Sequence, residues 1–334
     1  MDEERLLGES NPFLEVIEQV SRLAPIARPV LIIGERGTGK ELIAHRLHYL
    51  SPRWQHPFIK LNCAALNESL LDSELFGHEA GAFTGAQRRH PGRFERAHGG
   101  TLLLDELATM SDRLQEKLLR VIEYGEFERV GGQQPVQVDV RLICATHADL
   151  PALARAGKFR HDLLDRMAFD VITLPPLRVR QGDIVLLAHH FAQQWAQELG
   201  WPQAPTFDQA VLTQLCQHPW PGNVRELRNV VERSLFRYGE PGVPLSRLCL
   251  DPFASTWQMP TAEPATAGVS WPLDWKQHLA EYETALLRQA LLRSDFNQRQ
   301  AAQSLGLSYH QLRGLLRKYP GLLHRQVETD TDRE

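Results

Sequence analysis

Residues 29–41 read PVLIIGERGTGKE, an apolar run that leads directly into a glycine-rich segment with a lysine near its end. Helical sequence, LIAHRLHYL, follows at once. Glycines let backbone N–H groups turn inward around phosphate oxygens, the lysine adds a positive charge, and a helix N-terminus favours anions. This order of strand, loop, lysine and helix predicts a phosphate-binding loop in an α/β domain.

The segment matches the pattern G-x-x-x-x-G-K-[ST] as far as Lys40 and departs at the next position, where Glu41 replaces Ser or Thr. A hydroxyl ligand for Mg²⁺ is therefore missing, which leaves the first shell of the metal open. A plain glycine-rich turn is the structural alternative. The positions that we expect to hold the phosphates of ATP are Gly34, Glu35, Arg36, Gly37, Thr38, Gly39, Lys40 and Glu41.

Further apolar runs with β character alternate with helical sequence up to residue 175. They are FIKLN (58–62), TLLLDE (101–106), VRLICAT (140–146) and FDVITL (169–174). Continuous apolar strands separated by helices predict a parallel sheet with helices on both faces. The run TLLLDE ends in Asp105 and Glu106, and such a pair can supply one carboxylate for Mg²⁺ and another to polarise a water. Structural acids at a strand end are the alternative.

Helical patterns dominate the rest of the chain. One helical stretch covers about 183–238 and is interrupted at HPWPGN (218–223), where Pro and Gly end one helix and open another. A segment rich in Pro, Ala and Thr follows and is typical of a linker. The predicted division is an α/β subdomain (1–175), a helical subdomain (176–250), a linker (251–272), a second helical domain (273–322) and a tail (323–334).

Composition limits the function classes. The chain has 43% hydrophobic and 23% charged residues and a net charge of −4, so any nucleic-acid site must be a local basic patch. The four cysteines include no C-x-x-C pair, which argues against zinc and against a disulfide framework. The N-terminus has no apolar signal region, and no run approaches the roughly 20 apolar residues that span a bilayer. These features predict a cytoplasmic protein.

Residues 78–87, HEAGAFTGAQ, place Phe83 and Thr84 between two Gly-Ala pairs. Glycine changes direction at low cost, and an exposed aromatic side chain on a pliable loop suits a contact with a protein partner. In the alternative interpretation, Phe83 packs into the core of its own domain.

Four segments together resemble the AAA+ domain of bacterial enhancer-binding proteins, the activators of sigma-54 RNA polymerase. They are GERGTGKE, ELFGHEAGAFTGA, TLLLDE and WPGNVREL, and the resemblance extends from about Leu7 to Pro252. It implies an AAA+ P-loop NTPase with an α-helical lid, ATP hydrolysis in a ring, and Glu at position 41 as an ordinary family feature. The activity implied is remodelling of sigma-54 polymerase closed complexes into open complexes.

The resemblance also implies roles for individual residues. Asp105 would serve Mg²⁺ and Glu106 would activate water, with Asn62 as the switch residue that holds Glu106. His147 would be a sensor of the nucleotide, although it is alternatively an ordinary polar residue after a strand, and Arg225 would reach the phosphates from the lid. Arg160 and Arg166 would be arginine fingers that act in the neighbouring subunit of a hexamer, and a solvated charged face is their alternative. The residues expected to contact sigma-54 are Gly81, Ala82, Phe83, Thr84, Gly85 and Ala86, and those expected to relay the nucleotide state to them are Arg93, Glu95 and the segment 126–137.

The segment 282–319 resembles the Fis-type helix-turn-helix that ends these activators. We expect one helix to bury Ala301, Ala302 and Leu305, Gly306 to make the turn, and a second helix to bury Leu312, Leu315 and Leu316. Between residues 286 and 319 there are six basic residues and one acidic residue, a charge balance that favours DNA. The expected DNA-facing residues are Ser308, as N-cap, Tyr309, His310, Gln311, Arg313, Arg317 and Lys318. Which of them read bases stays open, and a plain helical hairpin is the alternative.

The AAA+ pattern begins within the first ten residues, so we expect control by another protein acting in trans or by the expression level of the chain. This layout resembles the phage shock activators of the family, which the protein PspA restrains. Trp54, in LHYLSPRWQHPF, is the expected docking point for such a negative regulator, and its alternative is packing on its own helix. Two rival functions remain: another AAA+ machine, such as a replication initiator or helicase loader, and a DNA-binding regulator whose nucleotide site is a passive switch.

Overall fold

The computed structural model describes residues 6–203, 205–253, 275–294 and 297–319. The chain divides into two compact units, residues 1–253 and 254–334, which we describe separately. Most of the expected linker and the whole of the expected tail lie outside the described residues.

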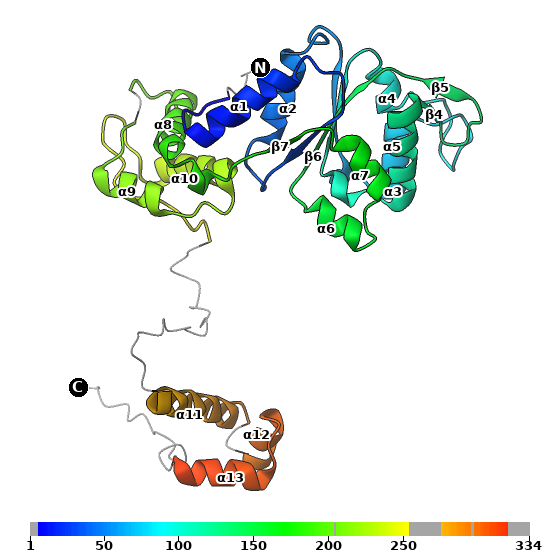
Figure 1. Cartoon of the computed structure of the whole chain (residues 1–334). Helices are drawn as coiled ribbons and strands as arrows, with labels where there is room; N and C mark the ends of the chain where they lie inside the picture. Colours follow the sequence, from blue (N-terminus) through cyan, green and yellow to red (C-terminus); the bar gives the residue numbers. More distant parts are fainter. Residues whose placement is uncertain (1–5, 204, 254–274, 295–296, 320–334) are drawn as a thin grey trace. The chain divides into compact units, whose positions relative to one another are not determined.

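A five-stranded sheet forms the centre of the first unit. Its order is β2-β3-β6-β1-β7, with every neighbouring pair parallel. Figure 1 labels β6 and β7 of this sheet, in the middle of the unit. The strands are β1 (Val30–Ile33), β2 (Phe58–Asn62), β3 (Thr101–Asp105), β6 (Arg141–Thr146) and β7 (Val171–Thr173). Each lies within one of the predicted runs, so the predicted parallel sheet is confirmed. β3 ends at Asp105, one residue earlier than the run TLLLDE suggested.

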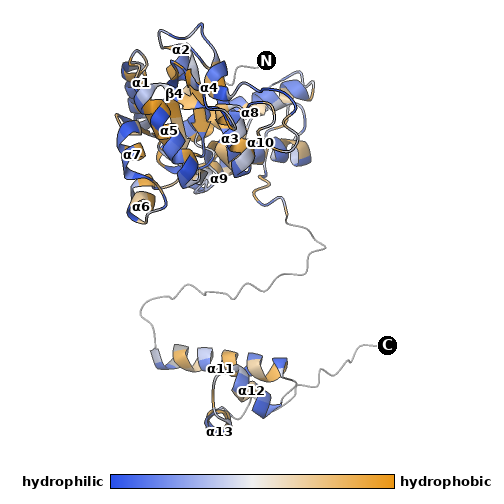
Figure 2. Cartoon of the chain, turned by 90° about the vertical axis from the view of Figure 1, so that its right-hand side faces the viewer, coloured by the Kyte–Doolittle hydropathy of each residue, from blue (hydrophilic) through white to orange (hydrophobic). Residues whose placement is uncertain are grey.

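Both faces of the sheet are covered, because the strands are apolar on both sides. Alternate residues of β3 and β6 point to opposite faces: Leu103 and Ile143 pack in one core cluster, while Leu104 and Leu142 pack in the other. The first cluster is closed by α1 (Asn11–Leu23) and α2 (Lys40–Tyr49), and the second by α3 (Glu68–Phe76), α5 (Asp112–Tyr124), α6 (Leu150–Arg155) and α7 (His161–Met167). Figure 2 shows hydrophobic residues gathered between elements whose outer faces are hydrophilic.

Arg141 is a charged residue within this core. It is 2% exposed, and its guanidinium donates to the carbonyl oxygens of Ala24 (2.7 Å), Leu23 (2.9 Å) and Leu47 (3.4 Å). These carbonyls belong to the C-terminal ends of α1 and α2, where a cation stabilises the helix dipole and satisfies orphan acceptors. One side chain at the start of β6 therefore joins two helices to the sheet.

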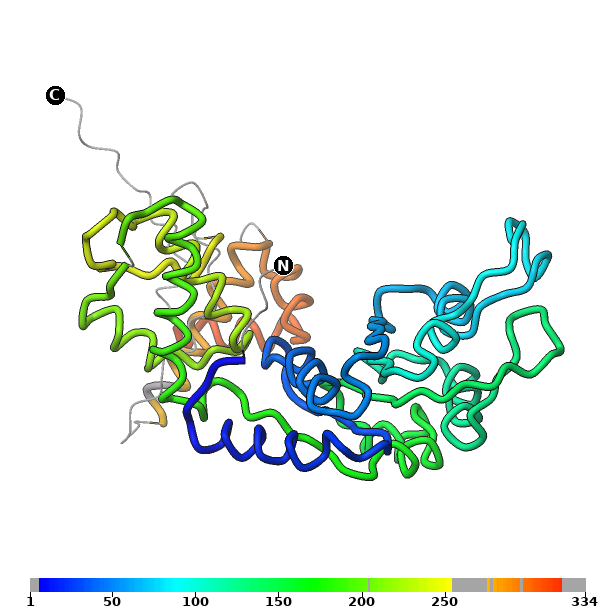
Figure 3. Tube along the Cα trace, turned by 90° about the horizontal axis from the view of Figure 1, so that it is seen from above, coloured from blue at the N-terminus to red at the C-terminus, as the bar shows by residue number. Residues whose placement is uncertain are grey.

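Two excursions from the sheet project together from one end of the unit. One follows α3 and precedes the short α4 (Arg93–Arg96), and it contains residues 78–90. The other is an antiparallel hairpin of β4 (Glu126–Glu128) and β5 (Pro135–Gln137), a local structure that the sequence analysis did not predict. Figure 3 shows both at the end opposite the lid helices.

The lid has its own core. It consists of α8 (Gln181–Glu198), α9 (Gln209–Gln217) and α10 (Asn223–Tyr238), preceded by a short 3-10 helix, η3 (Leu177–Val179). The predicted interruption at 218–223 is confirmed, since α9 ends at Gln217 and α10 begins at Asn223. Trp220 in this turn is fully buried and donates from Nε1 to the carbonyl oxygen of Leu215 at 2.8 Å. No described helix is long and apolar enough to cross a membrane.

The second unit is all helical. It contains α11 (Trp275–Arg293), α12 (Gln298–Ser304) and α13 (Tyr309–Lys318) around a small core. Gly306 turns the chain with a φ of +66°, and the Ser308 hydroxyl caps α13, as predicted. Of the residues expected inside, Leu305 and Leu315 are only partly buried, because they lie at the rim of the core that Leu312 and Leu316 fill.

Candidate nucleotide site and partner surfaces

A cavity of about 600 Å³ opens between the sheet and the lid. The phosphate-binding loop and the first turns of α2 form one wall, and Leu187, Phe191 and Arg225 of the lid contribute to another. Asn62, Asp105 and Glu106 reach it from the carboxyl ends of β2 and β3. Ligands bind at this edge of open α/β sheets in general. The structure thus brings most of the predicted nucleotide residues to one place.

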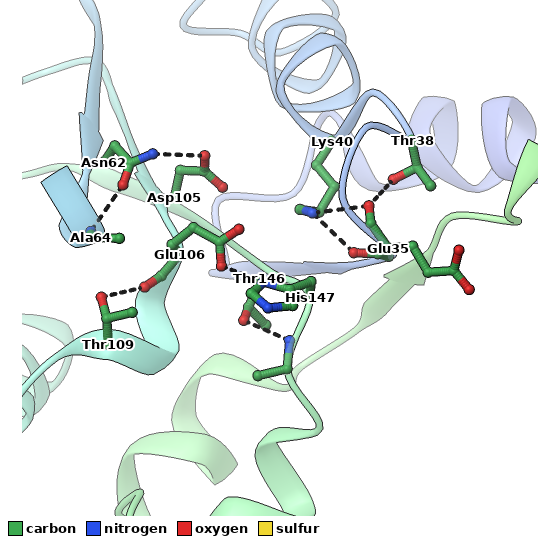
Figure 4. A network of polar contacts seen from close by, with 12 residues as sticks. Glu35, Thr38, Lys40, Asn62, Ala64, Asp105, Glu106, Thr109, Thr146 and His147 are labelled. Atoms are coloured by element: carbon green, nitrogen blue, oxygen red, sulfur yellow. Dashed lines mark hydrogen bonds and ion pairs between the residues drawn. The ribbon is translucent and has the colours of Figure 1, made fainter. Parts of the chain in front are cut away.

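The loop has the local geometry that its glycines predicted. Gly37 and Gly39 adopt left-handed φ values of +78° and +94°, and Gly39 is the N-cap of α2. Lys40 is 9% exposed, and its Nζ donates to the carbonyl oxygens of Gly34 (2.9 Å) and Glu35 (3.3 Å) (Figure 4). Burial lowers the pKa of Lys40, against the opposing effect of Glu106 and Asp105. The lysine is therefore already aimed into the loop.

Two glutamates of the predicted loop have contacts outside it. The Glu35 carboxylate accepts from both terminal nitrogens of Arg178, at 2.6 and 2.9 Å, and these bonds, with one from Asn223, lower the pKa of Glu35 to about 2. Glu35 and Gly34 are absent from the cavity lining, so Glu35 serves the loop through its backbone. Glu41 does line the cavity and pairs with Lys60 at 2.5 Å.

Asp105 and Glu106 occupy different environments. Burial and the neighbouring Glu106 raise the pKa of the Asp105 carboxyl. Glu106 has a φ of +54°, a strained backbone conformation for a non-glycine residue that commonly marks functional positions. Its Oε2 lies 2.6 Å from Nδ1 of His147, as Figure 4 shows. The pair thus has one carboxylate facing the cavity from the strand end and one held by an imidazole.

Asn62 differs from the expectation that it holds Glu106. Its Nδ2 lies 3.5 Å from Oδ2 of Asp105, and its Oδ1 accepts from the backbone N–H of Ala64 at 2.9 Å. The reason lies in the sheet, where Asn62 is the register partner of Asp105 on the adjacent parallel strand. In this structure it is His147 that holds Glu106, and His147 is not among the cavity-lining residues.

Oxygen ligands suitable for Mg²⁺ are present at the site. In the described part of the chain, no group of three or more His, Cys, Asp and Glu side chains could hold a metal ion by itself. Mg²⁺ usually needs only one or two protein carboxylates, because waters and substrate phosphates complete its octahedron. Asp105 fits this requirement, since a carboxyl whose pKa is raised by burial and a neighbouring acid is stabilised as the anion by a cation.

The two predicted arginine fingers lie away from the cavity of their own chain. Arg160 pairs with Asp162 at 2.8 Å, and Arg166 pairs with Glu123 at 2.9 Å. The Arg166 side chain is 59% exposed, and neither residue lines the nucleotide cavity. The structure therefore does not bring these residues to the site that their own chain forms.

The loop that carries Phe83 is a closed turn on an open surface. The N–H of Gly81 donates to the carbonyl oxygen of Ala86 at 2.7 Å, and the N–H of Ala86 donates to that of Phe83 at 3.0 Å. Phe83 is 45% exposed, and its ring lies edge-on to His78 with centroids 4.9 Å apart. Phe83 is therefore not packed into the core, and the surroundings of Gly81 and Gly85 are open.

A residue that the sequence analysis did not single out, Arg129, connects the two excursions. It donates to both carboxylate oxygens of Glu95, at 2.8 and 2.6 Å, and to Glu79 at 2.9 Å. Val130 adds backbone bonds, accepting from Glu79 at 3.1 Å and donating to Gly77 at 2.9 Å. Arg93, the other expected relay residue, pairs instead with Glu74. Sequence motifs indicate neither that Arg129 would pair with Glu95 and Glu79 nor that Arg93 would pair with Glu74.

The predicted DNA-facing residues of α13 are exposed. Gln311 and Lys318 make polar contacts within the unit: Gln311 accepts from the backbone N–H of Ser308 at 2.9 Å, which completes a capping box, and Lys318 pairs with Glu283 at 2.9 Å. Arg313 and Arg317 remain exposed basic residues on the same helix.

Trp54 is 54% exposed, and its ring lies edge-on to Tyr49 with centroids 6.3 Å apart. Tyr49 is itself exposed, so the two rings form one apolar surface patch at the end of α2, and the next residue, Leu50, is exposed as well.

The chain matches three family models: the sigma-54 interaction domain over residues 6–173, an AAA+ ATPase lid domain over 178–257, and the Fis family of bacterial regulatory proteins over 278–319. It is 60% identical over 327 residues to the Psp operon transcriptional activator of Escherichia coli (strain K12), covering 95% of this chain and 98% of that protein. It is 42% identical over 317 residues to the regulatory protein AtoC of the same organism, covering 94% and 67%.

Solved structures agree with this assignment. NtrX from Brucella abortus in complex with ATP aligns with a TM-score of 0.68 at 31% identity, covering 96% of this chain and 70% of that chain. The NtrX complex with ADP aligns with a TM-score of 0.69 at 32% identity, covering 94% and 69%. The predicted AAA+ fold, helical lid, Fis-type helix-turn-helix and resemblance to the phage shock activator PspF are confirmed. The chain belongs to the family of sigma-54-dependent AAA+ transcriptional activators.

Proposed function

We propose that this chain binds upstream DNA and, as a hexameric ring in the cytoplasm, hydrolyses ATP to remodel sigma-54 RNA polymerase closed complexes into open complexes. The observation that carries the proposal is the convergence of the phosphate-binding loop, Asp105, Glu106 and Arg225 on one cavity, in a chain that also exposes Phe83. A passive nucleotide switch would not need Glu106 in a strained conformation beside that cavity.

The chain's own residues supply most of the chemistry. Lys40 and the loop N–H groups bind the phosphates, and Glu106, oriented by His147, accepts a proton from the attacking water. Asp105 would hold Mg²⁺, which neutralises phosphate charge when bound. Arg225 reaches the same cavity from the lid.

The fingers require a second subunit. Arg160 and Arg166 lie outside their own cavity, so they act on a nucleotide only if a neighbour presents its site to them. An arginine finger contributes on the order of 10³–10⁵ in rate, so turnover should depend on ring assembly.

Coupling to sigma-54 would pass through the two excursions. Glu95 and Arg129 join the base of the Phe83 loop to the β4–β5 hairpin, and Phe83 and Thr84 form the exposed tip. A change in loop position then presents or withdraws this tip. Arg93 would contribute through its bond to Glu74 on α3.

Regulation would follow the phage shock relatives. The 60% identical relative is named for the Psp operon, which supports a role in the phage shock response to envelope stress, with PspA as negative regulator. The patch around Trp54 is the proposed docking surface. PspA should inhibit the wild type and a Leu14→Ala variant, in which another exposed apolar residue is removed, but not Trp54→Ala. Equal inhibition of all three would contradict this docking site.

Reconstituted open-complex formation with sigma-54 polymerase tests the main proposal. The wild type should form open complexes with ATP and not with ADP. Thr84→Ala should hydrolyse ATP at a normal rate without forming them, whereas Glu106→Gln should lose both activities. Normal activation by Thr84→Ala would refute the coupling, and ATP-independent activation would refute the motor.

A further inference from the structure

The turn that opens α10 contains two non-glycine residues in the left-handed region. Trp220 has a φ of +48° and Asn223 a φ of +53°. Such a conformation costs free energy and persists only where surrounding contacts fix it, often at functional sites. Trp220 is fixed by the lid core, whereas Asn223 is fixed by contacts outside the lid.

The Asn223 side chain joins three segments that are far apart in the sequence. It is fully buried, and its Oδ1 accepts from the backbone N–H of Leu177 in η3 at 2.8 Å. Its Nδ2 donates to the carbonyl oxygen of Arg36 at 3.0 Å and to Oε2 of Glu35 at 3.1 Å. A single amide therefore connects the start of the lid, the strand-to-lid connection and the phosphate-binding loop.

Glu35 completes the connection from the loop side. Its carboxylate accepts the bidentate pair from Arg178 of η3 and the bond from Asn223. Bidentate arginine–carboxylate pairs fix orientation as well as distance. Glu35, which does not line the cavity, therefore faces the lid.

Backbone contacts place the same junction against the loop apex. Val224 donates its N–H to the carbonyl oxygen of Gly37 at 3.0 Å, and a Cβ on Gly37 would lie 2.2 Å from the carbonyl oxygen of Gly222. Arg225, which lines the cavity, follows immediately. The direction of Arg225 is therefore determined where the loop and the lid meet.

We propose that Asn223 and Glu35 are positioning residues that lock the lid helix α10 onto the phosphate-binding loop and so hold Arg225 at the phosphate end of the cavity. The proposal rests on the proposed ATPase function, since it says which contacts determine the affinity of that site for the nucleotide. The interaction is electrostatically directed, because a donor at residue 223 faces a carboxylate at residue 35.

The test uses full-length variants and measures both ATP turnover and binding of a fluorescent ADP analogue. Asn223→Gly keeps a left-handed backbone without strain but lacks the amide, so it should raise the KM for ATP and the Kd for the analogue about tenfold, with kcat within about twofold. Asn223→Asp keeps the acceptor for Leu177 but places a second carboxylate beside Glu35, so nucleotide binding should be weaker still than in Asn223→Gly. In the double variant Asn223→Asp/Glu35→Gln the charge repulsion between residues 223 and 35 is gone, while the bond to the Arg36 carbonyl and the Glu35–Arg178 ion pair are still missing, so the Kd should fall clearly below that of Asn223→Asp without reaching the wild-type value.

Arg120→Gln is the matched control, because it removes an exposed arginine that pairs with Glu116 on α5, and it should leave both constants unchanged. Wild-type affinity in Asn223→Gly, or no rescue in the double variant, would overturn the proposal. A purely structural role for Asn223 predicts additive losses and no charge-dependent rescue. If the wild type binds nucleotide without hydrolysing it, the proposed function is wrong. The binding measurements would still test whether Asn223 and Glu35 position the lid.

Discussion

Replacement of Arg129 by methionine should release the Phe83 loop from the β4–β5 hairpin without unfolding the ATPase unit. The Arg129 side chain is 9% exposed and donates three charge-assisted hydrogen bonds, two to Glu95 and one to Glu79. Hydrogen bonds between charged groups each contribute about 1.5–3 kcal/mol when they are buried. Glu79 is 37% exposed and Glu95 only 15%, so most of the loss comes from Glu95.

Because the two bonds to Glu95 form one bidentate pair, we count them as a single charge-assisted interaction and expect the local opening free energy of the junction to fall by about 2–3 kcal/mol. The equilibrium constant for local opening should therefore be about 30- to 150-fold larger. Amide hydrogen exchange, followed by mass spectrometry on peptides that contain Glu79 and Val130, measures this directly, because their N–H groups make the backbone bonds between the two excursions. Peptides from β6 should keep their protection and serve as the internal reference.

Arg89→Met is the matched control. Arg89 approaches the same Glu95 carboxylate, but at 3.5 Å and with a side chain that is 57% exposed, so its loss should change exchange by less than about threefold. If Arg129→Met leaves the protection of Glu79 and Val130 unchanged, or if it exposes β6 equally, the junction is not held by this cluster.

Three further outcomes follow from the structure. Arg141→Met removes the guanidinium that bonds the carbonyl oxygens of Leu23, Ala24 and Leu47 at the ends of α1 and α2, so it should cost about 3–5 kcal/mol and lower the thermal midpoint by roughly 10 °C in a calorimetric scan; an unchanged midpoint would refute the capping role. Arg166→Ala should assemble and bind ATP but scarcely hydrolyse it. If the finger acts in trans, mixing this variant with Glu106→Gln subunits should restore part of the ATPase activity. A mixture as inactive as its components would contradict that role. The bonds from Arg178 and Asn223 hold the pKa of Glu35 in the folded state at about 2, below its usual value of 4.5. The ion pair therefore stabilises the fold fully above about pH 4.5, and this stabilisation is lost as the pH falls toward 2. The difference in melting temperature between the wild type and Glu35→Gln should shrink over that pH range, and a constant difference would contradict the ion pair.

The sheet and the nucleotide site could be predicted because their signals are local. Each strand is a short apolar run, and the phosphate loop, Asp105 and Glu106 directly follow or end such runs. The carboxyl ends of parallel strands share one edge, so residues at strand ends meet even when the strand order is unknown.

The partners of individual side chains could not be predicted, because they depend on register and on long-range packing. Asn62 contacts Asp105 rather than Glu106 since β2 and β3 pair in that register. Arg129 belongs to a segment of the expected relay, yet nothing in the spacing indicates that it would reach Glu95, 34 positions away. Asn223 was part of a recognised motif and was interpreted only as a turn, while its partner Glu35 lies 188 positions earlier.

The separate hydrophobic cores of the two units have a consequence for how the protein can be altered. Among the described residues, the core of the Fis-type helices is formed by residues of those helices themselves, including Leu287, Leu291, Leu312 and Leu316. The DNA-binding domain and the ATPase domain should therefore be exchangeable. Grafting the helix-turn-helix of another activator onto this ATPase should redirect it to a different promoter and leave its rate of ATP hydrolysis unchanged.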